Sequence, residues 1–235
     1  MKKNTKKKLF TLMLVIMLLA ITVVGGTLAW FTAEQQVTNT FTVGSVKIQQ
    51  NEWDQFGSPF QQNQELMPVV NMDNPSADEN YVHKVVTISN TGKNPAYVRT
   101  FIAVDARIAD YLYLDLNVAD GWKRDADRSA TINGKEYKVL VFTYENALAA
   151  NLTTPTLLKG VYLGAQVDVQ EKAEGVYEFC HKDADGEFQF SGYAVTETVQ
   201  VLVATQAVQS EGFSDATTAL DSAFGTELPS FVPVE

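Results

Sequence analysis

The chain has little cysteine and little histidine, and it lacks the common catalytic motifs. Cys180 is the only cysteine, so no disulfide forms within the chain, and its distance from the N-terminus excludes a lipoprotein anchor. His83 and His181 are the only histidines, and neither belongs to the His-Glu-x-x-His motif that sets two imidazoles beside a carboxylate on one helical face. Gly-x-Ser-x-Gly, Gly-x-Gly-x-x-Gly and phosphate-loop motifs are also absent. We therefore predict a protein without enzymatic activity, cofactor or dedicated metal centre.

Long hydrophobic runs are rare too, and the chain has only one. Residues 9–24 are almost entirely apolar, follow five lysines among the first eight residues, and precede Thr27 and Ala29. These small residues suit the minus-three and minus-one positions of a cleavage site, and the run is shorter than the roughly 20 residues of a membrane-spanning helix. We predict a signal peptide over residues 1–29, with Trp30 as the first mature residue. An uncleaved N-terminal anchor is the alternative.

Positive charge is scarce after this segment. Residues 1–29 hold five of the 18 basic residues and none of the 28 acidic ones, which leaves residues 30–235 with a net charge of −15. Nucleic acids and anionic membranes are bound through Lys and Arg, so we expect neither as a partner of the mature protein. Its 206 residues can bury a full core in one β-sandwich. We predict a single secreted domain over residues 30–235, with two small β-domains as the alternative.

Period-two alternation is the main pattern of the mature chain. Over residues 31–43 polar residues hold the even positions, and the apolar residues all fall on odd ones: Phe31, Ala33, Val37, Phe41 and Val43. This alternation is typical of a strand with one buried face. Residues 49–80 are rich in Gln, Asn, Asp and Pro, so we predict a long loop there, most flexible over 71–80. Further strands are predicted within residues 81–105 (a hairpin around 90–95), 111–118, 135–144, 156–169, 176–180, 187–190 and 195–203.

Turn and capping residues complete the prediction. Asn133-Gly134 is a strong hairpin signal, and residues 122–129 are charged and expected to be exposed. Ser214 or Asp215 is placed to cap a short helix that Gly225 would end. Strands at this spacing predict an all-β fold, a jelly-roll-like or Ig-like antiparallel β-sandwich with one short C-terminal helix.

An acidic run near the C-terminal third resembles a calcium loop. If Asp183, Asp185 and Gly186 held positions three, five and six of an EF-hand, His181 and Gly192 would fall where an acidic residue and a bidentate Glu are required. We therefore favour a hairpin turn and keep Asp183 and Asp185 as weak Ca²⁺ candidates.

Two other groups of residues could carry chemistry. Cys180 and His181 are adjacent in a predicted strand, so their side chains point to opposite faces and cannot act as nucleophile and base. We expect Cys180 to be buried and His83 and His181 to lie at the surface, with a zinc site that also uses distant carboxylates as the alternative.

The end of the signal resembles a known family. Gly25-Gly26-Thr27-Leu28-Ala29-Trp30-Phe31, then Thr42-Val43-Gly44-Ser45-Val46-Lys47-Ile48 and more weakly KVVTISNTGKNPAYVRTFIAV over 84–104, resemble the TasA, CalY and camelysin group of Gram-positive extracellular proteins. The resemblance implies cleavage by a SipW-type signal peptidase and a jelly-roll-like β-sandwich at the cell surface or in the biofilm matrix. Some members of the group polymerise into fibres.

The mature N-terminal segment is the candidate assembly strand. Phe31, Val37, Phe41 and Val43 form its apolar side, and such a strand can pair with its own sheet or with the sheet edge of a neighbouring copy. By resemblance to TasA, the second arrangement would build a head-to-tail fibre through a contact that does not close.

The leading hypothesis is a secreted, non-catalytic surface or biofilm-matrix structural protein that self-associates and contacts other matrix or surface proteins. A monomeric adhesin or glycan- or protein-binding module is the first alternative, for which Tyr111, Tyr113 and Trp122 would form an exposed patch. A camelysin-like metallopeptidase is the second, and the missing zinc motif weakens it.

Overall fold

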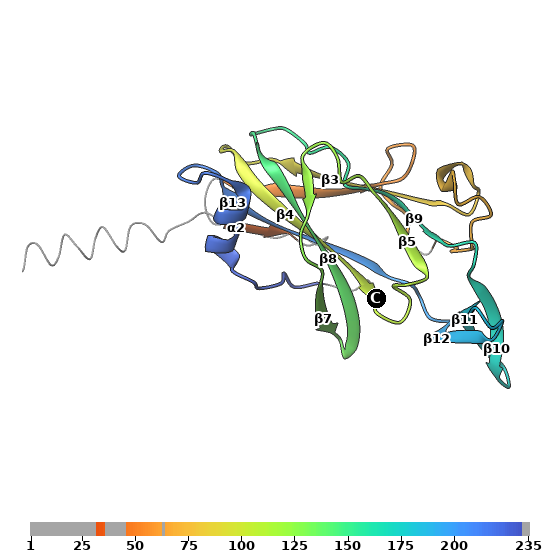
Figure 1. Ribbon diagram of the computed structural model, residues 1–235. Helices are drawn as coiled ribbons and strands as arrows, with labels where there is room; N and C mark the ends of the chain where they lie inside the picture. Colours follow the sequence, from red (N-terminus) through yellow and green to blue (C-terminus); the bar gives the residue numbers. More distant parts are fainter. Residues whose placement is uncertain (1–31, 36–45, 63, 232–235) are drawn as a thin grey trace, which may run out of the picture.

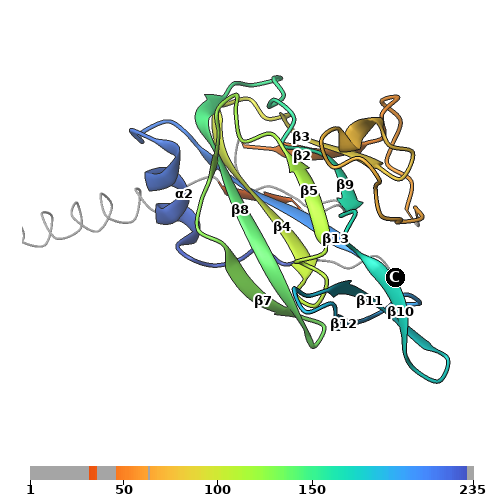
Figure 2. The same ribbon diagram turned by 45° about the vertical axis from the view of Figure 1, so that its right-hand side comes forward.

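The computed structural model describes residues 32–35, 46–62 and 64–231. Two antiparallel sheets pack face to face, and a third, smaller sheet lies at one end of them (Figures 1 and 2). The prediction of an all-β sandwich with one short C-terminal helix is confirmed. Within the described ranges, no helix is long and apolar enough to cross a membrane.

The largest sheet has six strands, all antiparallel to their neighbours. Its order is β1 (Thr32–Gln35), β13 (Val201–Gln209), β4 (Ala96–Asp105), β8 (Lys135–Leu148) and β6 (Trp122–Arg124), with β7 (Arg128–Ile132) paired to another part of β8.

The second layer of the sandwich has four strands, in the order β2 (Ile48–Trp53), β3 (Val82–Asn90), β9 (Leu158–Leu163) and β5 (Leu112–Leu116). The small end sheet consists of β10 (Asp168–Ala173), β11 (Val176–Lys182) and β12 (Phe188–Ala194). The β11–β12 hairpin agrees with the predicted turn at 183–186.

The predicted hairpin over residues 81–105 is wrong. The strands β3 and β4 lie in opposite sheets, so residues 91–95 carry the chain across the sandwich. Asn90 directs this crossing, because its fully buried side-chain amide donates to the carbonyls of Asn94 and Leu148, and its Oδ1 accepts from the amide of Gly92. A side chain that satisfies these backbone groups takes the place of a hairpin ladder.

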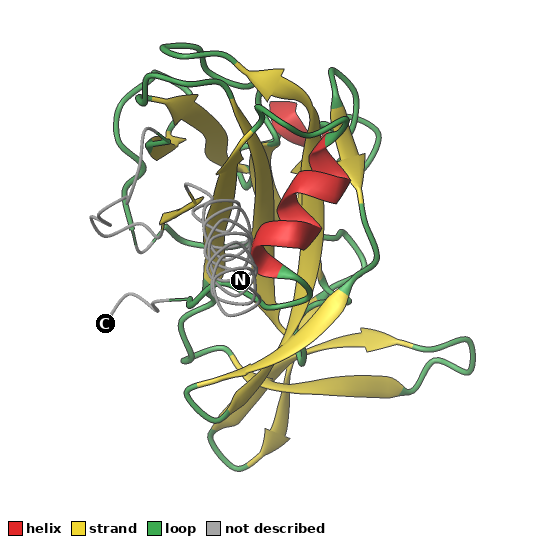
Figure 3. Cartoon of the chain, turned by 90° about the vertical axis from the view of Figure 1, so that its left-hand side faces the viewer, coloured by secondary structure: helices red, strands yellow, loops and turns green. Residues whose placement is uncertain are grey.

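Strand β4 is buried on both faces. Val98 and Ile102 face the core between the sheets, whereas Tyr97 and Phe101 belong to two smaller clusters on the outer face. The helix α2 (Ala216–Phe224) covers part of that outer face (Figure 3). The segment after the helix covers the rest, since it packs Leu228 and Phe231 against Phe101, Tyr137, Val139 and Leu202.

Local turn and cap predictions are confirmed where their residues are described. Asn133 and Gly134 have φ of 49° and 78° between β7 and β8, the left-handed geometry of a tight hairpin. The carboxylate of Asp215 accepts from the amide of Thr218, and Gly225 ends α2 with φ of 58°.

The long loop is shorter than predicted. Residues 48–53 form β2, which pairs with β3, so the loop begins at Asp54 rather than at residue 49. It contains one 3₁₀ turn, η1 (Pro75–Ala77), and the carboxylate of Asp78 accepts from the backbone amides of Val70, Asn71 and Asn80. These bonds hold the pKa of Asp78 below its usual value.

Candidate functional site

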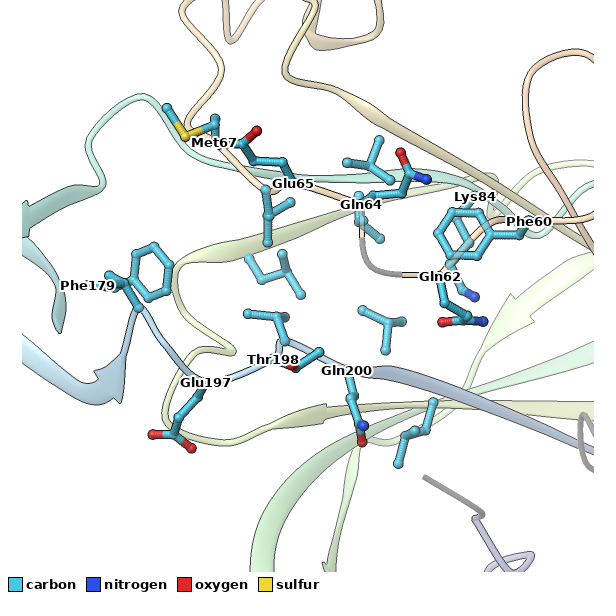
Figure 4. Close-up of a pocket in the computed structure, with 18 of the residues that line it drawn as sticks. Phe60, Gln62, Gln64, Glu65, Met67, Lys84, Phe179, Glu197, Thr198 and Gln200 are labelled. Carbon is cyan, nitrogen blue, oxygen red and sulfur yellow. The ribbon is translucent and has the colours of Figure 1, made fainter. Parts of the chain in front are cut away.

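A cleft of about 650 Å³ opens between the two large sheets (Figure 4). Its volume lies within the range of small-molecule and peptide sites, roughly 300–1,000 Å³. The ring of Phe60 stands at one end of the cleft and that of Phe179 at the other. Apolar side chains form its walls: Val82, Leu112 and Val161 of the four-stranded sheet on one side, and Val201 and Val203 of β13, with Val199 just before it, on the other.

The strand pattern explains this apolar lining. Val82 and Val161 are Cα partners on β3 and β9, and alternate residues of a strand share one face, so both point towards the core. Val201 and Val203 follow the same alternation at the start of β13. The small sheet adds Phe179 from β11, which packs against the main core.

The predicted strand over 195–203 begins later than expected, at Val201. Arg107 shapes the preceding segment, because its guanidinium bonds to Asp105, to both carboxylate oxygens of Glu197 and to the carbonyl of Gly192. Glu197 thus lies between β12 and β13, and residues 195–200 line the cleft outside both strands, with the amide of Val195 donating to the carbonyl of Tyr177 on β11. Hydrogen bonding from Arg107 lowers the pKa of Glu197 to about 2.

A loop forms the roof of the cleft. Residues 60, 62 and 64–67 line it, and they combine three amide or carboxylate side chains with apolar Leu66 and Met67. Figure 4 shows Gln62, Gln64 and Glu65 on this side. The roof therefore lines the cleft with both polar and apolar side chains, which suits an occupant with both kinds of surface.

The inner wall contains a buried ion pair. Lys84, which is 5% exposed, bonds to Glu52, and its ammonium lies 4.3 Å from the ring centroid of Phe60. Gln50 donates to the other oxygen of Glu52, and its own carbonyl accepts from Thr205 on the opposite sheet. A polar chain therefore links the two sheets beside the cleft, with each charge paired as burial requires.

The side chains that line the cleft can bind a ligand. The described part of its lining contains no histidine, cysteine or serine, and its charged groups at Glu52, Lys84 and Glu197 are engaged in ion pairs. Apolar walls, side-chain amides, the carboxylate of Glu65 and the hydroxyls of Thr196 and Thr198 are what it presents to a ligand.

Most of the predicted assembly strand lies outside the described residues. Thr27, Ala29 and Trp30 of the cleavage site, and Phe31, Val37, Phe41 and Val43 of the apolar side, fall there. The described part is β1, at the edge of the six-stranded sheet, and its antiparallel register with β13 runs from Thr32↔Val208 to Gln35↔Thr205.

The weak calcium candidates form a hairpin turn. Asp183 accepts the backbone amides of Asp185 and Glu187 on one oxygen and the side-chain amide of Gln189 on the other. The bond from the amide of Glu187 is the main cause of the lowered pKa of Asp183. Its carboxylate thus stabilises the β11–β12 turn, and in the described part of the chain no group of three His, Cys, Asp or Glu side chains could hold a metal.

Cys180 and His181 point apart, as predicted. The thiol of Cys180 is fully buried beside the carbonyl of Asp168, and burial raises its pKa. His181 instead lies 3.2 Å from the hydroxyl of Tyr111, from Nδ1 to the oxygen. His83 lies on β3, where its ring contacts Tyr81.

The predicted patch of Tyr111, Tyr113 and Trp122 is wrong. Trp122 is 3% exposed and Tyr111 is 8% exposed, and both belong to the main core. The residues around Trp122 are charged, but the pairing of β6 with β8 turns the indole inward. There its Nε1–H donates to the carbonyl of Pro155. Only Tyr113 of the three is not buried.

Sequence reasoning missed the cleft. The apolar residues Phe60, Leu66 and Met67 within a polar loop were the available signal, since isolated apolar side chains in a long loop have to cover something. None of the family models, curated proteins or solved structures compared with the chain matches it, so the geometry of the cleft and of β1 carries the functional argument.

Proposed function

We propose that the protein is a secreted, non-catalytic structural protein of the cell surface or biofilm matrix, and that it assembles by exchange of its N-terminal strand. The observation that carries this proposal is the position of β1. This four-residue strand lies at the edge of its sheet and pairs only with β13 among the described strands.

The edge beside β1 offers further pairing sites. Strand β13 extends over residues 201–204 beyond the partners of β1, and no described strand pairs with those residues on that edge. The carbonyl of Val203 there accepts the side-chain amide of Gln50. A longer strand bound in the same register would face residues 201–204, and a sheet edge of this kind is a template for strand addition.

The cleft supplies the matching apolar surface. Val201 and Val203 belong both to this edge and to the cleft wall. In the register of β1, a donated strand would place Val37 opposite Val203, where its backbone pairs with β13 and its side chain faces the cleft. Phe41 and Val43 would follow opposite residues 199 and 197, which line the cleft before β13 begins. Because the donor and acceptor surfaces differ, such a contact propagates instead of closing.

Export is the other part of the proposal. The predicted signal and the resemblance to the TasA, CalY and camelysin group support cleavage by a SipW-type peptidase and release to the surface or matrix. The excess of acidic residues favours solubility during export.

Two protein preparations test the assembly. Protein that begins at Trp30 and protein that begins at Ser45 are compared by size-exclusion chromatography with light scattering and by negative-stain microscopy. We expect filaments or large oligomers from the first and folded monomers from the second. Monomers from both preparations would refute strand exchange.

A cysteine pair distinguishes exchange from pairing within one chain. Ala33 and Ala207 are Cα partners, and antiparallel partners lie about 4.5–5.5 Å apart, within disulfide range. In a Cys180→Ala background, the A33C/A207C double variant should give a reducible ladder on a gel if strands exchange. A disulfide confined to monomers would contradict the proposal.

A binding module is the second candidate, and the 650 Å³ volume of the cleft favours it. It predicts a stable monomer that takes up a small amphipathic ligand.

A further inference from the structure

A row of aromatic side chains crosses the outer face of the four-stranded sheet. Val82, Val161 and Leu112 point into the cleft, so their sequence neighbours point to the opposite face. These neighbours are aromatic on all three strands, and the ring centroids are 4.7 Å apart for His83 and Tyr81, 5.8 Å for Tyr81 and Tyr162, and 5.4 Å for Tyr162 and Tyr113. The planes of Tyr162 and Tyr113 differ by 13°.

The surrounding residues fix the row in place. A Cβ at Gly160 would lie 2.4 Å from the ring of Tyr81, so glycine lets that ring lie against the sheet. The hydroxyl of Tyr81 donates to Asp115 at 2.8 Å, and the amide of Gln166 donates to the hydroxyl of Tyr113 at 2.8 Å. Burial is the first cause of the raised pKa of Tyr81, which keeps its hydroxyl protonated.

A groove continues the row towards the loop. It has a volume of about 420 Å³ and includes Tyr81 and His83 in its wall. Phe56, which is 83% exposed, belongs to the same wall. Amides and carboxylates supply the rest of its polar lining: Asp54, Gln55, Gln61, Gln64, Glu65, Glu79 and Asn80.

This combination fits one ligand chemistry. A pyranose ring has an apolar face of C–H groups that packs on an aromatic ring, and hydroxyls at its rim that need donors and acceptors. Tyr81 is 5% exposed and serves to support the row, so the partly exposed rings of His83, Tyr162 and Tyr113 are the ones that a sugar can contact. The groove provides the amides and carboxylates. Nucleobases also stack on aromatic rings, but they come with phosphates that this acidic surface repels.

Charge narrows the class of sugar. The groove holds the carboxylates of Asp54, Glu65 and Glu79, whereas the nearby ammonium of Lys84 is engaged with Glu52. Acidic glycans are therefore disfavoured. We propose that the row and the groove bind a glycan chain without acidic groups, such as an amino-sugar polymer. The row lies on the opposite face of the sheet from the cleft, whereas the groove shares Phe60, Gln64, Glu65, Met67 and Val82 with the cleft lining. Neither the row nor the groove contains a residue of β1 or β13, so the proposal does not rest on strand exchange.

Calorimetric titration with defined oligosaccharides tests the site. The mature protein is titrated with the β-1,4-linked hexamer of N-acetylglucosamine and with that of glucose, and saturable binding to at least one is expected. Tyr162→Ala and Tyr113→Ala should each weaken it roughly three- to ten-fold, the share of one aromatic contact. Tyr177→Ala is the matched control, because Tyr177 is 47% exposed on the small end sheet and should leave affinity unchanged.

Three results would overturn the assignment. The first is no binding of either hexamer at millimolar concentration. The second is an equal loss in Tyr177→Ala and Tyr162→Ala, with thermal melts that show all variants folded. The third is equally tight binding of a galacturonic acid oligomer, which would contradict the role of charge. Neither the row nor the groove contains a residue of β1, so failure of strand exchange does not affect the test.

Discussion

The ion pair of Lys84 and Glu52 allows a quantitative test of how the two sheets are held beside the cleft. Lys84→Met removes the ammonium but leaves the Glu52 carboxylate, whose side chain is 12% exposed, with Gln50 as its remaining donor. Removal of one partner of a buried pair costs about 3–5 kcal/mol. Because Glu52 borders the cleft and keeps one hydrogen bond, we predict a loss of about 2–3 kcal/mol.

The double variant separates pairing from packing. Lys84→Met with Glu52→Leu removes both charges and keeps apolar volume, so its stability should return to within about 1 kcal/mol of the parent. Urea unfolding followed by tryptophan fluorescence measures both variants, and the single variant should shift the midpoint down by about 1 M. Equal stability of the single and double variants would refute the argument, since it would mean that the Glu52 carboxylate left without Lys84 costs no stability.

Three further perturbations have defined outcomes. The pKa of Glu197 is depressed to about 2, so the stabilisation from its ion pair is present above the ordinary pKa of 4.5 and is lost as the pH falls towards 2. Thermal melts should show this loss of stability at low pH, and Arg107→Ala should abolish the pH dependence. An unchanged pH profile in the Arg107→Ala variant would contradict the prediction. Asp215→Ala removes the cap of α2 and should cost about 1 kcal/mol in urea unfolding; no change would mean that the cap is replaced by water. In Gly134→Ala the added Cβ would meet no atom within 4 Å, but the residue would still have φ near 78°. We therefore expect the free energy of unfolding to fall by about 1 kcal/mol through backbone conformation alone. A neutral effect would show that the turn can change type.

The parts of the fold that follow from neighbouring residues could be predicted. Asn133-Gly134 specifies a tight turn because both residues accept left-handed geometry, whatever the rest of the chain does. Asp215 and Gly225 likewise set the two ends of α2 through contacts within a few residues. These signals are complete within a short window of sequence.

The choice of pairing partner could not be predicted. Residues 90–95 contain ordinary turn residues, and the crossing between sheets depends on bonds from Asn90 to Leu148, 58 residues away. The charged neighbours of Trp122 suggested exposure, yet β8 provides the ladder that turns the indole inward. Alternation of apolar and polar residues identifies a strand, but it does not show which other strand pairs with it.

The candidate site depends on the same distant partners. Val82 and Val203 line the same cleft although 121 positions separate them. The aromatic row likewise joins residues of β3, β9 and β5, and only the register Tyr113↔Tyr162 makes neighbours of the last two. Each of these residues, taken alone, is typical of ordinary packing in a strand.

The positions of β1 and of the last described residue have a mechanical consequence. Thr32 pairs with Val208 at one end of β13, whereas Phe231 packs near Leu202 at the other end. Tension between Thr32 and Phe231 would therefore pull β1 lengthwise past β13. Under such shear, the hydrogen bonds of the β1–β13 ladder share the load instead of breaking one at a time. If β1 is exchanged as proposed, the ladder that carries this load joins two copies, and a stretched fibre would resist through it.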